Sequence, residues 1–209
     1  MPTRVKICGI TRLEDAQQAV DLGAAALGFN FYPPSPRYIE PEAARAIVRR
    51  LPPFVTSVGV FANETDAGRV ISIAREAGAT AVQLHGPGFP DLQELLSAVT
   101  LVVAVPVREG FTAEALGKFR PNAYLLDAFD ADRLGGTGKT FDWNAAREAK
   151  RYGPIILAGG LTPENVGQAV RVVRPFAVDV ASGVESAPGI KDSAKLSAFF
   201  AAVTEADRE

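Results

Sequence analysis

The chain has 209 residues, of which 47% are hydrophobic and 22% are charged, and its formal net charge is −2. This length fits one domain spanning residues 1–209, and the mixed charges predict no binding to nucleic acid or to a membrane surface. One cysteine and one histidine exclude an internal disulfide, a cysteine-based metal cluster and a histidine-rich metal site. No apolar run approaches the ~18 residues that span a bilayer, and no signal-peptide core is present, so we expect a cytoplasmic protein.

Short runs rich in β-branched residues recur along the chain, and each is followed by apolar residues at helical spacing. The expected strands are Val5–Cys8, Ala25–Phe31, Thr56–Phe61, Ala81–Leu84, Leu101–Val105, Ala123–Leu126, Pro154–Ala158 and Phe176–Val180. The weakest helical pattern, Ala113–Phe119, follows the fifth strand.

Several helix starts carry capping signals. Thr11 with Glu14 three residues later forms a capping-box pattern for the first helix, and Asn63 is expected to cap the third. The sixth helix is expected to open near Asp142, and Thr162-Pro163-Glu164 places a proline at the first helical position of the seventh.

Strands and helices alternate strictly, which implies parallel strands joined by right-handed crossovers. Eight such units in a chain of this length predict an α/β protein with a single-domain (β/α)8 TIM barrel. The alternative is an open doubly wound sheet. A G-x-G-x-x-G turn after the first strand would favour that fold, but Cys8-Gly9-Ile10-Thr11 does not match it.

Polar residues and glycines gather where the expected strands end. They are Cys8, Asn30, Arg37, Asn63, Gln83, His85, Arg108, Asp127, Gly159, Gly160, Asp179, Ser182 and Gly183. Active sites of (β/α)8 barrels lie at the carboxyl ends of the strands. These residues therefore predict a ring around a small-molecule pocket.

Two glycine-rich turns indicate a phosphate site. Gly159-Gly160 follows the seventh strand, and Ala181-Ser182-Gly183 follows the eighth. Glycines allow the backbone to approach a ligand, exposed amides favour an anion, and these two loops often build the phosphate site of such barrels. The alternative is that the glycines only form tight turns.

The segment Gly135–Thr140 looks like part of a nucleotide-binding P-loop. The full pattern needs a glycine five residues before Gly138, where Arg133 stands. We therefore expect no ATP or GTP site there, and we interpret the segment as a mobile glycine-rich loop over the pocket.

The first strand carries a lysine and the only cysteine on one face, because Lys6 and Cys8 alternate with Val5 and Ile7. A lysine that faces inward is costly unless it is paired, so this face is unlike ordinary core. Cys8 by itself has two interpretations. The commoner one is a small buried hydrophobe, and the other is a reactive thiol at a strand end.

Taken together, several segments resemble phosphoribosylanthranilate isomerases, a family of the tryptophan pathway. The matching segments, in order, are Lys6–Thr11, Gly28–Tyr38, Val58–Phe61, Gln83–Gly86, Leu126–Asp127, Gly135–Gly138, Phe141–Trp143, Leu157–Leu161, Asp179–Glu185 and Gly189–Asp192. One departure is visible: the family often has two serines before the glycine of the Asp179–Glu185 motif, and here the first is Ala181. Backbone contacts to a ligand would survive this change, whereas Ala181 could not supply the hydroxyl contact that a serine there would make.

The resemblance implies an Amadori rearrangement of N-(5-phosphoribosyl)anthranilate to the 1-deoxyribulose form, without cofactor or metal. By the same resemblance, Cys8 is the base that removes a proton from the sugar and Asp127 is the acid that opens its ring. A free thiol is only partly ionised at neutral pH, and Lys6 on the same face would favour the thiolate.

The resemblance also implies binding roles. Arg37 would hold the anthranilate carboxylate, and the phosphate would lie on Gly159, Gly160, Ser182 and Gly183. Asp179 would hold a substrate hydroxyl or, alternatively, pair with Lys6, because strands eight and one are neighbours in a barrel. His85 is expected to be a structural residue of the pocket wall.

Two other functions compete with this one. A histidine-pathway isomerase performs the same rearrangement, but that relative carries a carboxylate at the position of Cys8. A non-catalytic phosphate-binding barrel would have no need of Cys8, Asp127 and Arg37 together. We expect a small phosphorylated substrate, and a monomer rather than a homodimer.

Overall fold

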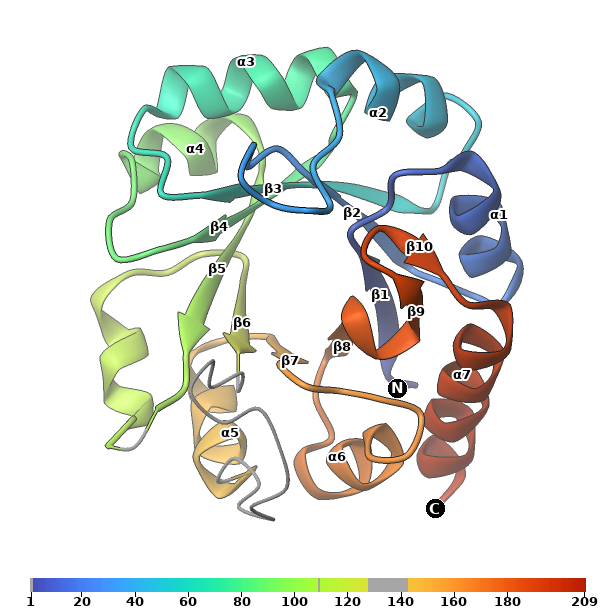
Figure 1. Cartoon of the computed structure of the whole chain (residues 1–209). Helices are drawn as coiled ribbons and strands as arrows, with labels where there is room; N and C mark the ends of the chain where they lie inside the picture. Colours follow the sequence, from blue (N-terminus) through green and yellow to red (C-terminus); the bar gives the residue numbers. More distant parts are fainter. Residues whose placement is uncertain (1, 109, 128–142) are drawn as a thin grey trace.

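The chain folds into a closed barrel of parallel strands with helices around it (Figure 1). The structure is a computed structural model that describes residues 2–108, 110–127 and 143–209. The barrel strands are β1 (Arg4–Cys8), β2 (Ala26–Asn30), β3 (Thr56–Ala62), β4 (Ala81–His85), β5 (Thr100–Pro106), β6 (Ala123–Asp127), β7 (Ile155–Ala158) and β8 (Ala177–Val180). They pair in chain order, and β1 closes onto β8. The predicted (β/α)8 barrel is therefore confirmed, and the open-sheet alternative is wrong.

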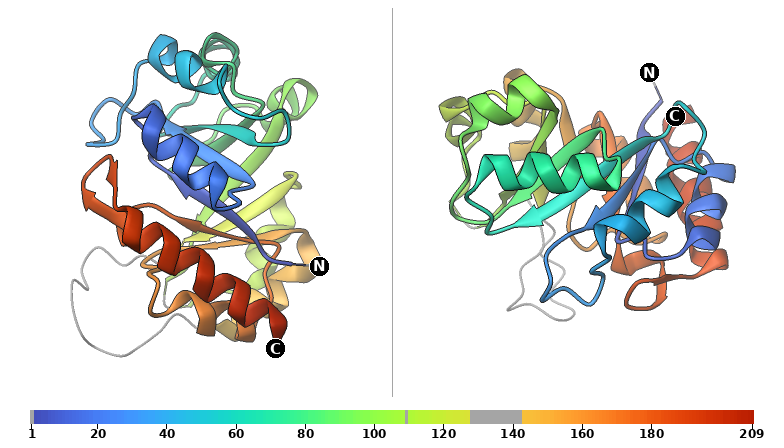
Figure 2. Two further views of the ribbon diagram at one scale, coloured as in Figure 1. Left: turned by 90° about the vertical axis from the view of Figure 1, so that its right-hand side faces the viewer. Right: turned by 90° about the horizontal axis from the view of Figure 1, so that it is seen from above.

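Helices form an outer layer around the barrel (Figure 2). The α-helices are α1 (Leu13–Asp21), α2 (Pro41–Val48), α3 (Ala67–Ala77), α4 (Leu92–Ala98), α5 (Trp143–Ala149), α6 (Val166–Val173) and α7 (Ser193–Arg208), and the 3₁₀ helices are η1 (Ala113–Lys118), η2 (Lys150–Tyr152) and η3 (Ser182–Val184). A hairpin of β9 (Glu185–Ala187) and β10 (Ile190–Lys191) precedes α7. Within the described ranges, no helix is long and apolar enough to cross a membrane.

Alternation along the strands divides the side chains between two sides of the barrel wall. In β1, Val5 and Ile7 belong to the core between strands and helices, whereas Cys8 packs inside the barrel. Seven further interior side chains are Val102, Ala104, Ala123, Leu125, Ile156, Ala158 and Ala177. Burial of one large apolar side chain stabilises the fold by about 1.5–3 kcal/mol, so both layers contribute to stability.

The first helix is not capped as predicted. It begins at Leu13 with Arg12 at the N-cap and no capping contact from a side chain. The Thr11 hydroxyl instead donates to the Gly189 carbonyl at 2.6 Å, in the turn between β9 and β10. The capping-box prediction is wrong because a distant loop takes the hydroxyl.

Capping of the third helix also differs from the prediction. Asp66 is the N-cap of α3, and its carboxylate accepts from the backbone N–H of Arg69 at 3.1 Å. Asn63 has a φ of +56°, and its N–H donates to the His85 carbonyl at 2.9 Å. The β3–β4 contact therefore holds Asn63 in the loop. The start predicted near Asp142 lies outside the described residues.

Candidate active site

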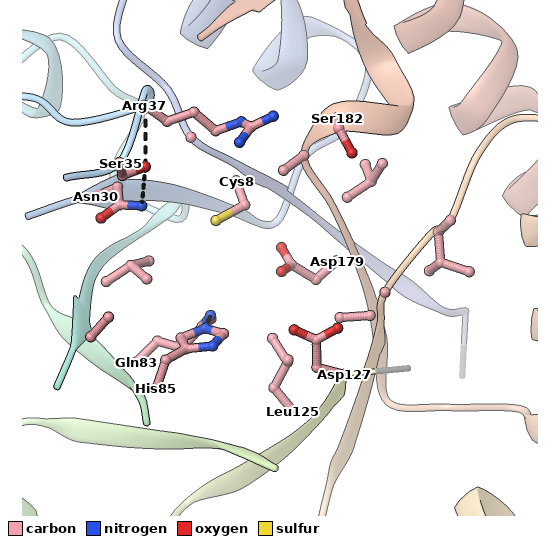
Figure 3. Close-up of a pocket in the computed structure, with 18 of the residues that line it drawn as sticks. Cys8, Asn30, Ser35, Arg37, Gln83, His85, Leu125, Asp127, Asp179 and Ser182 are labelled. Atoms are coloured by element: carbon pink, nitrogen blue, oxygen red, sulfur yellow. Dashed lines mark hydrogen bonds between the residues drawn. The ribbon is translucent and has the colours of Figure 1, made fainter. Parts of the chain in front are cut away.

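A cavity of about 510 Å³ opens at the carboxyl ends of the barrel strands (Figure 3). It is lined by all eight residues that the sequence predicted for binding or catalysis: Cys8, Arg37, Asp127, Gly159, Gly160, Asp179, Ser182 and Gly183. Pockets of this volume suit small-molecule ligands. The structure thus brings the eight residues together, and their roles stay predictions.

Lys6 and Asp179 form an ion pair inside the barrel. The two residues are register partners of β1 and β8, and Lys6 Nζ donates to Asp179 Oδ1 at 2.8 Å. Their side chains are 5% and 9% exposed. Burial opposes the charge on Lys6, but Asp179 and the neighbouring Cys8 together raise the pKa of Lys6 above its ordinary value. Lys6 is therefore cationic at neutral pH, and the predicted pairing is confirmed.

Cys8 lies at the end of β1, partly exposed to the cavity. Gly28 of β2 leaves room for it: a Cβ there would stand 2.9 Å from Cys8 Sγ and 3.1 Å from Lys6 Nζ. Burial raises the pKa of the Cys8 thiol above its ordinary value, although Lys6 lowers it. The lysine thus offsets only part of the burial effect, and the thiol is largely protonated at neutral pH.

Asp127 ends β6 and faces the same central space as Asp179 and His85 (Figure 3). Its backbone carbonyl accepts from the N–H of Val107 at 2.8 Å, which ties the strand end to the loop after β5. Burial lowers the pKa of His85 below its ordinary value, against a smaller opposing effect of Asp127, so the imidazole is neutral at pH 7.

Gln83 is a polar residue buried beneath the cavity, with 1% of its surface exposed. Its Nε2 lies 2.6 Å from His85 Nε2. Among the described residues, Gln83 Oε1 has no hydrogen-bond partner. Such a buried acceptor suits a donor group on a ligand.

Arg37 reaches the cavity from the loop after β2. Its backbone N–H donates to Ser35 Oγ at 3.1 Å, and Ser35 Oγ accepts from Asn30 Nδ2 at 3.0 Å (Figure 3). The aliphatic part of the Arg37 side chain packs against Gly9, where an added Cβ would lie only 2.5 Å from Arg37 Cδ. Glu185 pairs with the guanidinium, with Nη2 and Oε2 2.7 Å apart.

The two glycine-rich loops are in direct contact. A Cβ on Gly183 would lie 1.9 Å from the Leu161 carbonyl oxygen, so only glycine fits. Gly160 has a φ of +63°, and no heavy atom lies within 4 Å of its Cβ position, so its backbone borders open space. This arrangement allows a ligand to approach the backbone of both loops.

Asn165, not Thr162, organises the start of α6. Its Oδ1 accepts from the Thr162 N–H at 2.8 Å, and its Nδ2 donates to the Gly160 carbonyl at 2.9 Å. The helix begins at Val166, so the predicted start at Thr162-Pro163 is wrong. The asparagine instead closes the turn that carries Gly160. The Gly135–Thr140 segment lies outside the described residues.

The chain is similar to proteins of one family. A family model described as N-(5'phosphoribosyl)anthranilate (PRA) isomerase matches residues 5–202. The N-(5'-phosphoribosyl)anthranilate isomerase of Citrifermentans bemidjiense is 51% identical over 199 residues, which cover 95% of this chain and 96% of that protein.

Solved structures agree in fold. A phosphoribosyl anthranilate isomerase in complex with reduced 1-(o-carboxyphenylamino)-1-deoxyribulose 5-phosphate superposes with a TM-score of 0.83 at 43% identity, covering 97% of this chain and 99% of the other. Mutually generated monomers of the dimeric isomerase from Thermotoga maritima superpose with a TM-score of 0.85 at 42% identity and the same coverage.

Proposed function

This chain belongs to the N-(5'-phosphoribosyl)anthranilate isomerase family, and we propose that Cys8 and Asp127 carry the proton transfers of its reaction. The reaction belongs to tryptophan biosynthesis and rearranges N-(5-phospho-β-D-ribosyl)anthranilate to 1-(2-carboxyphenylamino)-1-deoxy-D-ribulose 5-phosphate. The observation that carries the proposal is that a thiol and a carboxylate face one cavity flanked by a guanidinium and two glycine-rich loops.

The ends of the substrate match the two sides of the cavity. The compound bound in a related structure carries a carboxyphenyl group and a 5-phosphate. We place the carboxylate on Arg37, because a guanidinium binds carboxylates with paired hydrogen bonds. We place the phosphate on the loops of Gly159-Gly160 and Ser182-Gly183, where backbone can approach an anion. The sugar then lies between Cys8 and Asp127.

The chemistry needs one acid and one base. Asp127 donates a proton to the ring oxygen, the bond between that oxygen and C1 breaks, and the nitrogen lone pair forms an iminium. Cys8 thiolate removes the proton on C2, and the C–H electron pair forms an enamine. Loss of the enol proton and protonation at C1 give the ketone. The bonding electrons remain within the substrate, so the isomerisation is balanced without an oxidant.

Two further residues are assigned to binding and orientation. Asp179 holds a substrate hydroxyl while its Oδ1 remains paired with Lys6. The buried Gln83 Oε1 accepts from a second hydroxyl. His85 stays a wall residue of the cavity, and Lys6 favours the thiolate form of Cys8.

Turnover of the substrate tests the function directly. Phosphoribosylanthranilate is generated in the cuvette, and loss of its fluorescence is followed after addition of the purified chain. Fast decay that depends on the chain is expected. Absence of decay, together with turnover of the histidine-pathway aminoaldose, would overturn the substrate assignment.

The phosphate assignment predicts the effect of Gly183→Ala. The new methyl group would overlap the Leu161 carbonyl and push the two loops apart, at a cost of about 1–3 kcal/mol in unfolding free energy. We expect weaker competitive inhibition by inorganic phosphate and a higher KM. Gly68→Ala, at an exposed position of helix α3, is the control and is expected to leave both unchanged. Unchanged inhibition by phosphate in Gly183→Ala would contradict the assignment.

The ion pair predicts a pH dependence. Because the base is the thiolate and burial raises the pKa of Cys8, kcat/KM is expected to keep rising with pH beyond the ordinary thiol value of about 8.5. Cys8 is the only cysteine, so its alkylation by iodoacetamide reports its ionisation alone. Lys6→Met removes a nearby cation that lowers the pKa of Cys8, so the alkylation profile is expected to move to higher pH.

The control for that shift is Lys150→Met, which removes a lysine that contacts the Val173 and Arg174 carbonyls away from the cavity. This variant is expected to keep the profile of the unmodified chain. A Lys6→Met profile that stays in place or moves to lower pH would show that Lys6 does not favour the thiolate.

We also propose that the chain acts as a monomer in the cytoplasm. Each of the residues assigned above comes from one chain, so the described site needs no second copy. A base that is a free thiol needs a reducing compartment. A mass of twice 22.1 kDa in light scattering would overturn the monomer. This measurement is needed because one related isomerase is described as dimeric.

A further inference from the structure

The Arg37 guanidinium is held by a carboxylate to which the sequence patterns assign no role. Glu185 Oε1 and Oε2 lie 2.9 Å and 3.1 Å from Arg37 Nε, and Oε2 lies 2.7 Å from Nη2. This pairing occupies one edge of the planar guanidinium and fixes its plane. The second edge, formed by Nη1 and the remaining N–H of Nη2, points away from Glu185.

Glu185 is paired a second time, with Lys191 of β10. Lys191 Nζ donates to Glu185 Oε1 at 2.8 Å and to the Cys8 carbonyl at 2.6 Å. The Lys191 side chain is fully buried, that of Glu185 is 5% exposed, and that of Arg37 is 24% exposed. Burial opposes ionisation of Glu185, but hydrogen bonds from Arg37 and Lys191 lower its pKa below the ordinary value.

These three groups therefore carry two positive charges and one negative charge. Arg37, the most exposed of them, presents the remaining positive charge to the cavity. An isolated Arg37–Glu185 pair would be neutral overall and would attract an anion weakly. Lys191 offsets the charge of Glu185, so that Arg37 can be held in place and still attract an anion.

The hairpin that carries Glu185 and Lys191 is attached to the first β/α unit. The Lys191 backbone N–H donates to Asp15 Oδ2 at 3.1 Å, and Thr11 donates to the Gly189 carbonyl at 2.6 Å. Figure 3 shows the Arg37 side chain extending from its loop toward Ser182. The hairpin that holds Arg37 is thus attached to the β/α unit that carries Cys8, so the carboxylate contact and the base have a defined relative position.

We propose that Glu185 and Lys191 are positioning residues for recognition of the substrate carboxylate by Arg37. Glu185 orients the guanidinium so that its second edge meets the anthranilate carboxylate, and Lys191 preserves the positive charge of the site. This inference rests on the proposed contact between Arg37 and that carboxylate. Neither residue touches the reacting atoms in this assignment.

Glu185→Gln separates orientation from charge. The variant adds one positive charge to the site, which by itself would lower KM for an anionic substrate. Loss of the charged bidentate contact with Glu185 instead misaligns Arg37, so we expect KM to rise. A rise of about tenfold lies within the range of interaction energies measured in ion-pair networks. We expect kcat to change little and inhibition by inorganic phosphate to stay the same, because phosphate binds the other loops.

A double-mutant cycle with Arg37→Ala tests whether Glu185 acts through Arg37. Glu185→Gln is expected to have no further effect on KM once Arg37 is alanine. The control is Glu209→Gln, which breaks a similar two-pronged pair with Arg171 on the surface and is expected to change nothing in the assay.

The outcomes distinguish the inference from its premise. If Arg37→Ala raises KM but Glu185→Gln leaves it unchanged or lowers it, the positioning role is wrong and the carboxylate contact stands. If Arg37→Ala leaves KM unchanged, Arg37 does not bind the substrate carboxylate, and the positioning role of Glu185 and Lys191 is wrong as well. If Glu185→Gln does not fold, Arg37→Lys provides the test. The lysine keeps the positive charge but cannot make the paired hydrogen bonds of a guanidinium. A KM equal to that of the unmodified chain would therefore overturn the proposal.

Discussion

Cys8→Ala is expected to lower kcat/KM by about 10²–10⁴-fold, the contribution of one positioned proton carrier, or about 3–5 kcal/mol of transition-state stabilisation. The thiolate takes the C2 proton in the proposed reaction, and an alanine has no group to accept it. Cys8→Ser is expected to lose activity as well, because a hydroxyl of similar size ionises far less readily than a thiol. The measurement is kcat/KM from the fluorescence decay.

The fold is expected to tolerate both substitutions at Cys8. The side chain is partly exposed to the cavity, so its removal creates no closed void. Inhibition by inorganic phosphate and the thermal midpoint are therefore expected to stay close to those of the unmodified chain. Activity of Cys8→Ser near that of the unmodified chain would show that Cys8 is not the base.

Asp127→Asn is expected to lower kcat/KM by a similar factor of about 10²–10⁴. The amide has the shape of the carboxylic acid but cannot deliver its proton to the ring oxygen, so ring opening slows. Asp66→Asn is the matched control, because it makes the same change at the exposed N-cap of α3, where asparagine caps as well as aspartate. It is expected to be fully active. Substantial activity of Asp127→Asn would remove the acid role.

Deuterium at C2 of the ribose distinguishes the acid from the base. Cys8→Ser slows removal of the C2 proton, so its isotope effect on kcat/KM is expected to exceed that of the unmodified chain. Asp127→Asn slows the earlier ring opening, so its isotope effect is expected to fall toward 1. The opposite pattern would exchange the two roles.

The barrel and the position of its site follow from local patterns. Period-2 alternation assigns Val5 and Ile7 to the outer face of β1 and Lys6 and Cys8 to the inner one, and the structure agrees. Eight β/α units leave a closed parallel barrel as the favoured way to bury the apolar faces, and closure brings the strand ends together. The residues that surround the cavity could therefore be predicted from the sequence alone.

Helix caps were less predictable, because a capping hydroxyl competes with distant partners. Thr11 has the right neighbours for a capping box, yet its hydroxyl contacts Gly189 across the hairpin. Asn63 has the right residue type, yet its backbone is held by β4 while Asp66 caps the helix. In both cases a contact between separate segments overrides the local signal.

The sequence by itself determined the fold class, the face of β1 that carries Lys6 and Cys8, and the strand ends that surround the cavity. The tertiary structure confirmed the pairing of Lys6 with Asp179, and only the tertiary structure showed that Glu185 joins Arg37 to Lys191 and that Gly183 packs against Leu161. Alternation and turn signals are local, since they depend on a few consecutive residues. These three contacts instead join residues brought together by strand register and loop packing, which emerge when the barrel closes.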